Sequence, residues 1–151
     1  MCRDARSAER LAEEFLHRCP RKGRLNPGVR SLLDALSPDH ALHVITNGFQ
    51  EVQGVKLHAS GIGTSSRSYS RATRRPPPNR IPRIFHKAMD LVGAAAEDSL
   101  MVGDDPRNDV EGARGVGMYQ AHYVITPAES PDSGSTYRFG HFDELRELLG
   151  R

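Results

Sequence analysis

The sequence contains no tryptophan, only two cysteines and no long apolar segment. Because it has no run of about 18 apolar residues, it predicts no membrane span. Residues 1–10 are polar and lack the apolar region of a signal peptide, so we expect a cytoplasmic protein. The cysteines, Cys2 and Cys19, form no CxxC pair. A disulfide between them is possible, but this usage favours reduced thiols.

Acidic residues are missing from one long stretch, since none occurs between Glu51 and Asp90. Within it, residues 64–80 contain five arginines and no lysine. Subtracting these five from the 21 basic residues of the chain leaves 16, against 19 acidic residues. The net charge of +2 therefore depends on one segment. Such a basic loop is compatible with a non-enzymatic module that contacts nucleic-acid phosphates, but only Tyr69 is available there for base stacking, which argues against nucleic acid.

Apolar periodicity predicts helices and strands that alternate along the chain. Helices are predicted at 8–18, 26–36, 50–60, 82–92, 108–115 and 141–149, and strands at 41–46, 99–103 and 117–125. This alternation indicates an α/β fold with a parallel sheet and right-handed crossovers. In such folds the functional site lies at the carboxyl ends of the strands.

The first candidate site follows the strand at 41–46. Thr46, Asn47 and Gly48 come directly after a buried apolar run. The Thr46 hydroxyl and the backbone N–H groups of the next two residues can hold a phosphate oxygen. The alternative is an ordinary polar turn between a strand and a helix.

The second candidate site follows the strand at 99–103, where Asp104 and Asp105 are joined by Asp109 four residues later. Clustered carboxylates repel one another unless a cation offsets their charge. Mg²⁺, bound through one or two carboxylates and waters, is suited to this role. The alternative is structural, because Asp105 can cap the helix that Pro106 begins. Both interpretations can hold together, with Asp104 bound to the metal and Asp105 or Asp109 in a structural role.

Together the two motifs resemble those of the haloacid dehalogenase (HAD) superfamily of hydrolases. The segment HVITNG resembles its phosphate-binding motif, and SLMVGDDPRNDVEGARGVGM resembles its metal-binding motif. The resemblance implies a Rossmann-like three-layer core, a phosphoryl group bound by Thr46, Asn47 and Gly48, and Mg²⁺ bound at Asp104, Asp105 and Asp109. The segment ITNGF resembles the corresponding segment in the branch of the family that hydrolyses pyrimidine and noncanonical nucleoside monophosphates. This resemblance implies a small phosphorylated substrate.

The family's first strand ends in Asp-x-Asp, whose first aspartate is the nucleophile, and this sequence contains no Asp-x-Asp. The resemblance therefore assigns residues 1–23 to the end of a helical cap and its linker. It assigns 24–151 to the C-terminal part of the core, with 63–81 aberrant or disordered. We expect the chain as written to be an inactive phosphatase or a catalytically dead fragment, because it has no nucleophile.

The family's third motif is a lysine, and no lysine lies between Lys56 and Lys87. Asn79-Arg80 occupies its place, so an arginine either substitutes for this cation or belongs to a solvated loop. Residues 72–81 can be back-translated so that a frame one base earlier reads SDEAAAAKPN. We therefore hypothesise that 63–81 is translated out of frame. Its three consecutive prolines and few large apolar residues predict a loop and a gap in the sheet.

Overall fold

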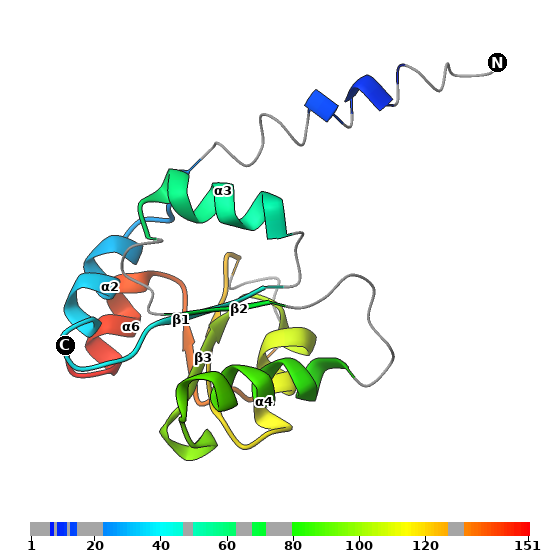
Figure 1. The fold of residues 1–151 in the computed structure, drawn as a ribbon. Coiled ribbons are helices and arrows are strands. Elements are labelled where there is room, and N and C mark those ends of the chain that lie inside the picture. The colour runs from blue at the N-terminus through cyan, green and yellow to red at the C-terminus, as the bar shows by residue number, and fades with distance from the viewer. Residues whose placement is uncertain are drawn as a thin grey trace.

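The computed structural model describes residues 7, 9–11, 13–14, 23–46, 50–62, 68–71, 80–126 and 132–151. Helices and strands alternate along most of these residues, and the strands form parallel sheets, which confirms the α/β prediction (Figure 1). None of the helices in the described ranges has the length and apolar character needed to cross a membrane. Most of the helix predicted at 8–18 lies outside the described residues.

The strands form two parallel sheets. In the first, β1 (His43–Thr46) pairs with β2 (Ser68–Arg71). In the second, β4 (Tyr119–Tyr123) lies between β3 (Leu100–Gly103) and β5 (Tyr137–Phe139). Every pairing is parallel, as expected for strands joined by crossover connections. The first candidate site begins at the end of β1, and the second follows directly after β3.

One face of the second sheet is covered by α2 (Val29–Leu36) and α6 (Phe142–Leu148). Their side chains pack with those of β4 and β5 in a cluster that we call the α6 cluster, made of Leu32, Ala121, Phe139 and Leu145. Leu145 is fully buried. The apolar stripes of α2 and α6 therefore pack on this face of the sheet and form one of the two hydrophobic clusters.

The opposite face is covered by α4 (Arg80–Val92), which contributes Ile84 and Phe85 to a second cluster with Ala113 and Met118. We call this the α4 cluster. Leu100 of β3 packs against the α6 cluster and its neighbour Met101 against the α4 cluster. Successive strand residues point to opposite faces, so these contacts establish the predicted three layers.

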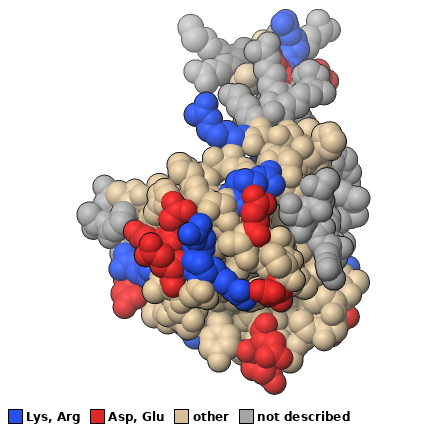
Figure 2. Space-filling model, turned by 90° about the vertical axis from the view of Figure 1, so that its left-hand side faces the viewer, with Lys and Arg blue, Asp and Glu red and all other residues tan. Residues whose placement is uncertain are grey.

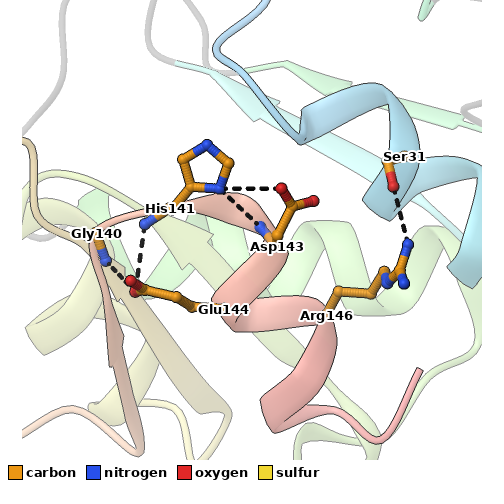
Figure 3. Close-up of polar contacts among 6 residues, drawn as sticks. All are labelled: Ser31, Gly140, His141, Asp143, Glu144 and Arg146. Atoms are coloured by element: carbon orange, nitrogen blue, oxygen red, sulfur yellow. Dashed lines mark hydrogen bonds and ion pairs between the residues drawn. The ribbon is translucent and has the colours of Figure 1, made fainter.

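Helix α6 begins with a capping box (Figure 3). The His141 ring accepts a hydrogen bond from the Asp143 N–H at 3.3 Å. The Glu144 carboxylate in turn accepts from the N–H groups of Gly140 and His141. Arg146 donates to the Ser31 hydroxyl at 3.1 Å and so connects α6 to α2. These contacts fix the two helices that cover the outer face of the sheet.

Helix α2 begins later than predicted. The sequence predicts this helix over 26–36, but the helix starts at Val29, with Gly28 at the cap position and a φ of 81°. This left-handed conformation suits glycine. A Cβ on Gly28 would also lie 3.0 Å from the Cβ of Phe142, so packing against α6 sets where α2 starts.

Two short strands correct the sequence-based assignment. β2 lies inside the segment that was predicted to be a loop without a strand, and its backbone pairs with β1 along all four residues. β5 was not predicted, because three residues carry no readable periodicity. Leu148, within the helix predicted at 141–149, is 50% exposed and does not belong to the buried face of that helix. Helix α3 (Gln50–Ser60), followed by Gly61 at a φ of 69°, matches its prediction.

Charged side chains of both signs are interspersed on the face that contains α2 and α6 (Figure 2). Arg151 forms an ion pair with Asp39 at 2.6 Å on this part of the molecule. The described charges on this face therefore form no patch of a single sign. Residues 72–79, which hold two of the five arginines in the basic segment, lie outside the described residues.

Candidate active site at the carboxyl ends of β1 and β3

The chain after β3 turns directly into a short π-helical segment, η3 (Pro106–Glu111), which continues as α5 (Gly112–Arg114). The carbonyl of Asp105 accepts hydrogen bonds from both Asp109 N–H, at 2.9 Å, and Val110 N–H, at 3.3 Å. The bond from Val110 to Asp105 joins residues five positions apart, which is the hydrogen-bond pattern of a π-helix. Such π-type turns are frequent at functional sites.

Asp105 caps this segment, which confirms the structural alternative for this residue. One carboxylate oxygen accepts from the N–H groups of Arg107 and Asn108 at 2.9 Å each. The other accepts from the side-chain amide of Asn108. The hydrogen bonds from Asn108, and then the nearby Arg107, hold the pKa of Asp105 below its ordinary value. Both of its oxygens are therefore committed to the local fold.

Asp109 points back to the end of β3. Its carboxylate is half-buried and accepts a hydrogen bond from the Asp105 N–H at 3.1 Å. It approaches the backbone of Gly103 so closely that a Cβ added there would overlap the carboxylate. The absence of a side chain at Gly103 is what allows an acid from the π-helical turn to reach the end of the strand.

The charge at this site is unfavourable to a third ionised carboxylate. Burial raises the pKa of Asp109 above its ordinary value of 3.8, and the charges of Asp104 and Asp105 raise it further. Asp104 itself is exposed, and its side chain accepts no hydrogen bond from a described residue. Asp104 is therefore the exposed carboxylate of the three at the end of β3.

The raised pKa of Asp109 predicts how stability depends on pH. Between 3.8 and the higher folded-state value, the folded protein binds more protons than the unfolded chain, so stability falls as the pH rises through this window. Asp109→Asn, which can still accept from Asp105, is therefore expected to raise the free energy of unfolding at pH 7 in magnesium-free buffer. Urea unfolding of both proteins tests this, and their difference should shrink as the pH falls below 3.8. A less stable Asn variant at pH 7 would contradict the assignment.

The other candidate site is described only in part. Thr46 ends β1 and is half-buried, while Asn47 and Gly48 lie outside the described residues. Ile45 of β1 and Met101 of β3 pack against the same α4 cluster. One helix therefore covers both of the strands that lead into the candidate motifs.

The structure describes the three acids predicted to bind Mg²⁺ but only part of the basic segment. Within the described ranges, no three His, Cys, Asp or Glu side chains are arranged to hold a metal ion. Asp109 lies against Gly103, Asp104 is exposed after it, and Asp105 serves as the cap. Of the arginines in the basic segment, Arg74 and Arg75 lie outside the described residues, and Arg80, which stands in the place of the family's lysine, begins α4.

Two residues that shape this site were not singled out from the sequence. Gly103 provides the space that Asp109 enters, and Asn108 holds the Asp105 carboxylate. A glycine between an apolar strand and paired acids was a visible signal for the first. An asparagine three residues after an N-capping aspartate was a visible signal for the second.

Comparison with known proteins places the chain in a family. A sequence model described as haloacid dehalogenase-like hydrolase matches residues 3–117. A phosphoserine phosphatase of Thermus thermophilus is 33% identical over 94% of this chain and 56% of its own length. The pyrimidine 5'-nucleotidase YjjG of Escherichia coli is 30% identical over 82% of this chain and 56% of its own length.

Solved structures agree on the fold. The HAD hydrolase YfnB of Bacillus subtilis, determined with bound magnesium, superposes with a TM-score of 0.80 at 19% identity, over 92% of this chain and 61% of that one. The chain thus spans little more than half the length of the relatives that it matches. The family match covers the strand β1, the paired acids after β3 and the π-helical turn between them and β4. This chain belongs to the haloacid dehalogenase-like hydrolases.

Proposed function

We propose that this chain provides the phosphate- and magnesium-binding part of a phosphomonoester hydrolase that acts on a small phosphorylated substrate such as a nucleoside monophosphate. The observation that carries the proposal is the carboxylate cluster at the end of β3, where Asp109 lies against Gly103 and burial, followed by the charges of Asp104 and Asp105, raises the pKa of Asp109. A divalent cation offsets such a cluster of charge. The similarity to a phosphoserine phosphatase and a pyrimidine 5'-nucleotidase supports the phosphomonoester class.

The residues present fit a magnesium ion. Mg²⁺ takes one or two carboxylates and keeps several waters, so Asp104 and Asp109 would suffice to hold it without a third acid. When bound, the ion supplies positive charge that offsets the charge of the phosphoryl oxygens. In this proposal Thr46 donates its hydroxyl to a phosphoryl oxygen, and the backbone N–H groups of Asn47 and Gly48 extend the same site.

The chain alone is expected to bind substrate without hydrolysing it. The family resemblance gives no counterpart in this sequence for the attacking aspartate or for the lysine of the third motif. A bound phosphoryl group would then be held and oriented but not attacked. This separates the two halves of the proposal, since binding and turnover can be measured independently.

Calorimetric titration with uridine 5'-monophosphate in magnesium buffer tests binding, and p-nitrophenyl phosphate tests turnover. We expect magnesium-dependent nucleotide binding and no turnover. Thr46→Val keeps the side-chain shape but removes the hydroxyl, and should weaken nucleotide binding about tenfold, the value of one hydrogen bond to a charged group.

Asp98→Asn provides the matched control, because Asp98 is exposed in the short helix η2 (Ala96–Asp98), away from the strand end. It should bind as the wild type does. Tighter binding of phosphoserine than of the nucleotide would redirect the substrate assignment to the other relative. Turnover that Asp104→Asn abolishes would show that the chain is a complete enzyme, and failure to bind any phosphorylated compound would reject the proposal.

A further inference from the structure

The space that holds the Asp109 carboxylate is bordered by a histidine of β4. The carboxylate occupies the place that a side chain on Gly103 would fill. Gly103 is paired in parallel register with His122 of β4. Neighbouring strands of a sheet lie about 4.8 Å apart, and paired residues direct their side chains to the same face. His122 is therefore the residue of β4 that lies next to the space occupied by Asp109.

The packing of both strands agrees with this placement. Met101 of β3 packs against the α4 cluster, and residues two apart in a strand share a face, so Gly103 opens to the α4 face. Ala121 of β4 belongs to the α6 cluster, which directs its neighbour His122 to the opposite face. The segment η3, which contains Asp109, contacts both β3 and β4. His122 and Asp109 thus lie on the same side of the sheet.

The His122 ring is held by a residue of the segment that leads into β5. His122 is 2% exposed, and its Nδ1 shares a hydrogen bond with the Ser133 hydroxyl at 2.9 Å. A buried ring nitrogen that loses its partner carries the cost of an unmade hydrogen bond. Ser133 is therefore the residue that keeps the ring of His122 in its orientation.

Arg114 connects Ser133 back to Asp109. Its guanidinium donates to the carbonyl oxygens of Ser133, at 2.8 Å, and of the next residue, at 2.7 Å. Arg114 ends α5, which continues directly from η3. The contacts run along the helix from Asp109 to Arg114 and across to Ser133, and they return to Asp109 through His122 and the strand pairing. This closed network holds Asp109 from its own helix and from the neighbouring strand.

We propose that Ser133 and His122 are positioning residues, which hold the Asp109 carboxylate at the end of β3 in the orientation that a bound cation requires. The identity of that cation, magnesium, rests on the proposed function. Residues that orient a metal-binding side chain without touching the metal change the affinity for the metal by about 10- to 100-fold when they are replaced. The segment before β5 is thus part of the site, although it contributes no ligand.

Hydrogen exchange of the Asp105 amide in magnesium-free buffer tests the positioning directly, because this amide donates to the Asp109 carboxylate at 3.1 Å. Ser133→Ala removes the hydroxyl that holds His122, so exchange of the Asp105 amide should become about fivefold faster, the value of roughly one hydrogen bond. Ser133→Thr retains a hydroxyl and should restore the slow exchange.

Calorimetric titration with MgCl₂ tests the consequence for the cation. Ser133→Ala should bind magnesium about tenfold more weakly than the wild type. Arg114→Gln interrupts the same network at another point and should weaken binding in the same direction, so the test does not depend on one variant. Ser99→Ala is the matched control, because the Ser99 hydroxyl donates to the Ala95 carbonyl at 2.7 Å, before the opposite end of β3. It should leave magnesium affinity and Asp105 exchange within about twofold of the wild type.

The outcomes separate this inference from the proposed function. Magnesium bound equally by the wild type and Ser133→Ala would leave the proposed function standing and overturn the inference. Equal changes in Ser133→Ala and Ser99→Ala would overturn it as well, because the loss would then reflect general destabilisation. Faster Asp105 exchange in Ser133→Ala, in a chain that binds no magnesium in any form, would support the positioning of Asp109 and reject the proposed function.

Discussion

Replacing Phe85 with alanine is expected to lower the free energy of unfolding by about 4 kcal/mol, the usual cost of removing a buried aromatic ring. Phe85 is 1% exposed and packs with Ile84, Ala113 and Met118. This cluster also receives Ile45 and Met101, one from each sheet. The ring therefore stabilises the contact between α4 and both strands that lead to the candidate site.

Urea unfolding followed by circular dichroism measures this loss, with Leu91→Ala as the control on the same helix. Leu91 is 58% exposed, and its truncation should change stability by less than about 0.5 kcal/mol. Equal losses for the two variants would mean that α4 is not packed through the face that contains Phe85. A small loss at Phe85 would contradict the α4 cluster as a core.

Gly103→Ala is expected to destabilise the protein by about 2 kcal/mol, within the range found for overpacked sites. The new Cβ would overlap the carboxylate of Asp109, which must then move away from the end of β3. The hydrogen bond from the Asp105 N–H to Asp109 would be lost with it. The variant should consequently lose affinity for magnesium as well as stability.

Gly54→Ala is the opposite case and the appropriate control. Gly54 lies inside α3, and a Cβ there would meet no atom within 4 Å. Alanine is favoured over glycine in a helix by up to about 1 kcal/mol, so this variant should be more stable than the wild type. If both substitutions changed the free energy of unfolding in the same direction, the close approach of Asp109 to Gly103 would not be the reason that position 103 requires glycine.

Elements with strong local signals could be predicted from the sequence. Helix α3 was predicted with its observed bounds, and the apolar runs before Thr46 and Asp104 identified β1 and β3. β2 was missed because its residues, Ser-Tyr-Ser-Arg, carry no apolar pattern. Its strand conformation depends on pairing with β1, which is a tertiary effect that propensity cannot report. The start of α2 depends similarly on contact between Gly28 and α6.

The candidate site was also predicted in part. An aspartate before proline indicated the cap at Asp105, and the hydrogen bonds to Arg107 and Asn108 confirm it. The approach of Asp109 to Gly103 depends on the π-helical turn, which adds a residue to the first turn of the segment. No spacing rule in the sequence distinguishes that turn from an ordinary α-helix. The roles of Thr46, Asn47 and Gly48 in phosphate binding stay predictions.

The measurement that tests the central claim most directly is thermal unfolding of the chain in MgCl₂ and in NaCl of equal ionic strength. Magnesium bound to the folded state should raise the free energy of unfolding by about 2.7 kcal/mol at a concentration 100-fold above its Kd. The increase should disappear in Asp104→Asn and persist in Asp98→Asn. An unfolding temperature that magnesium leaves unchanged in the wild type, or raises equally in all three proteins, would contradict a magnesium site at the end of β3.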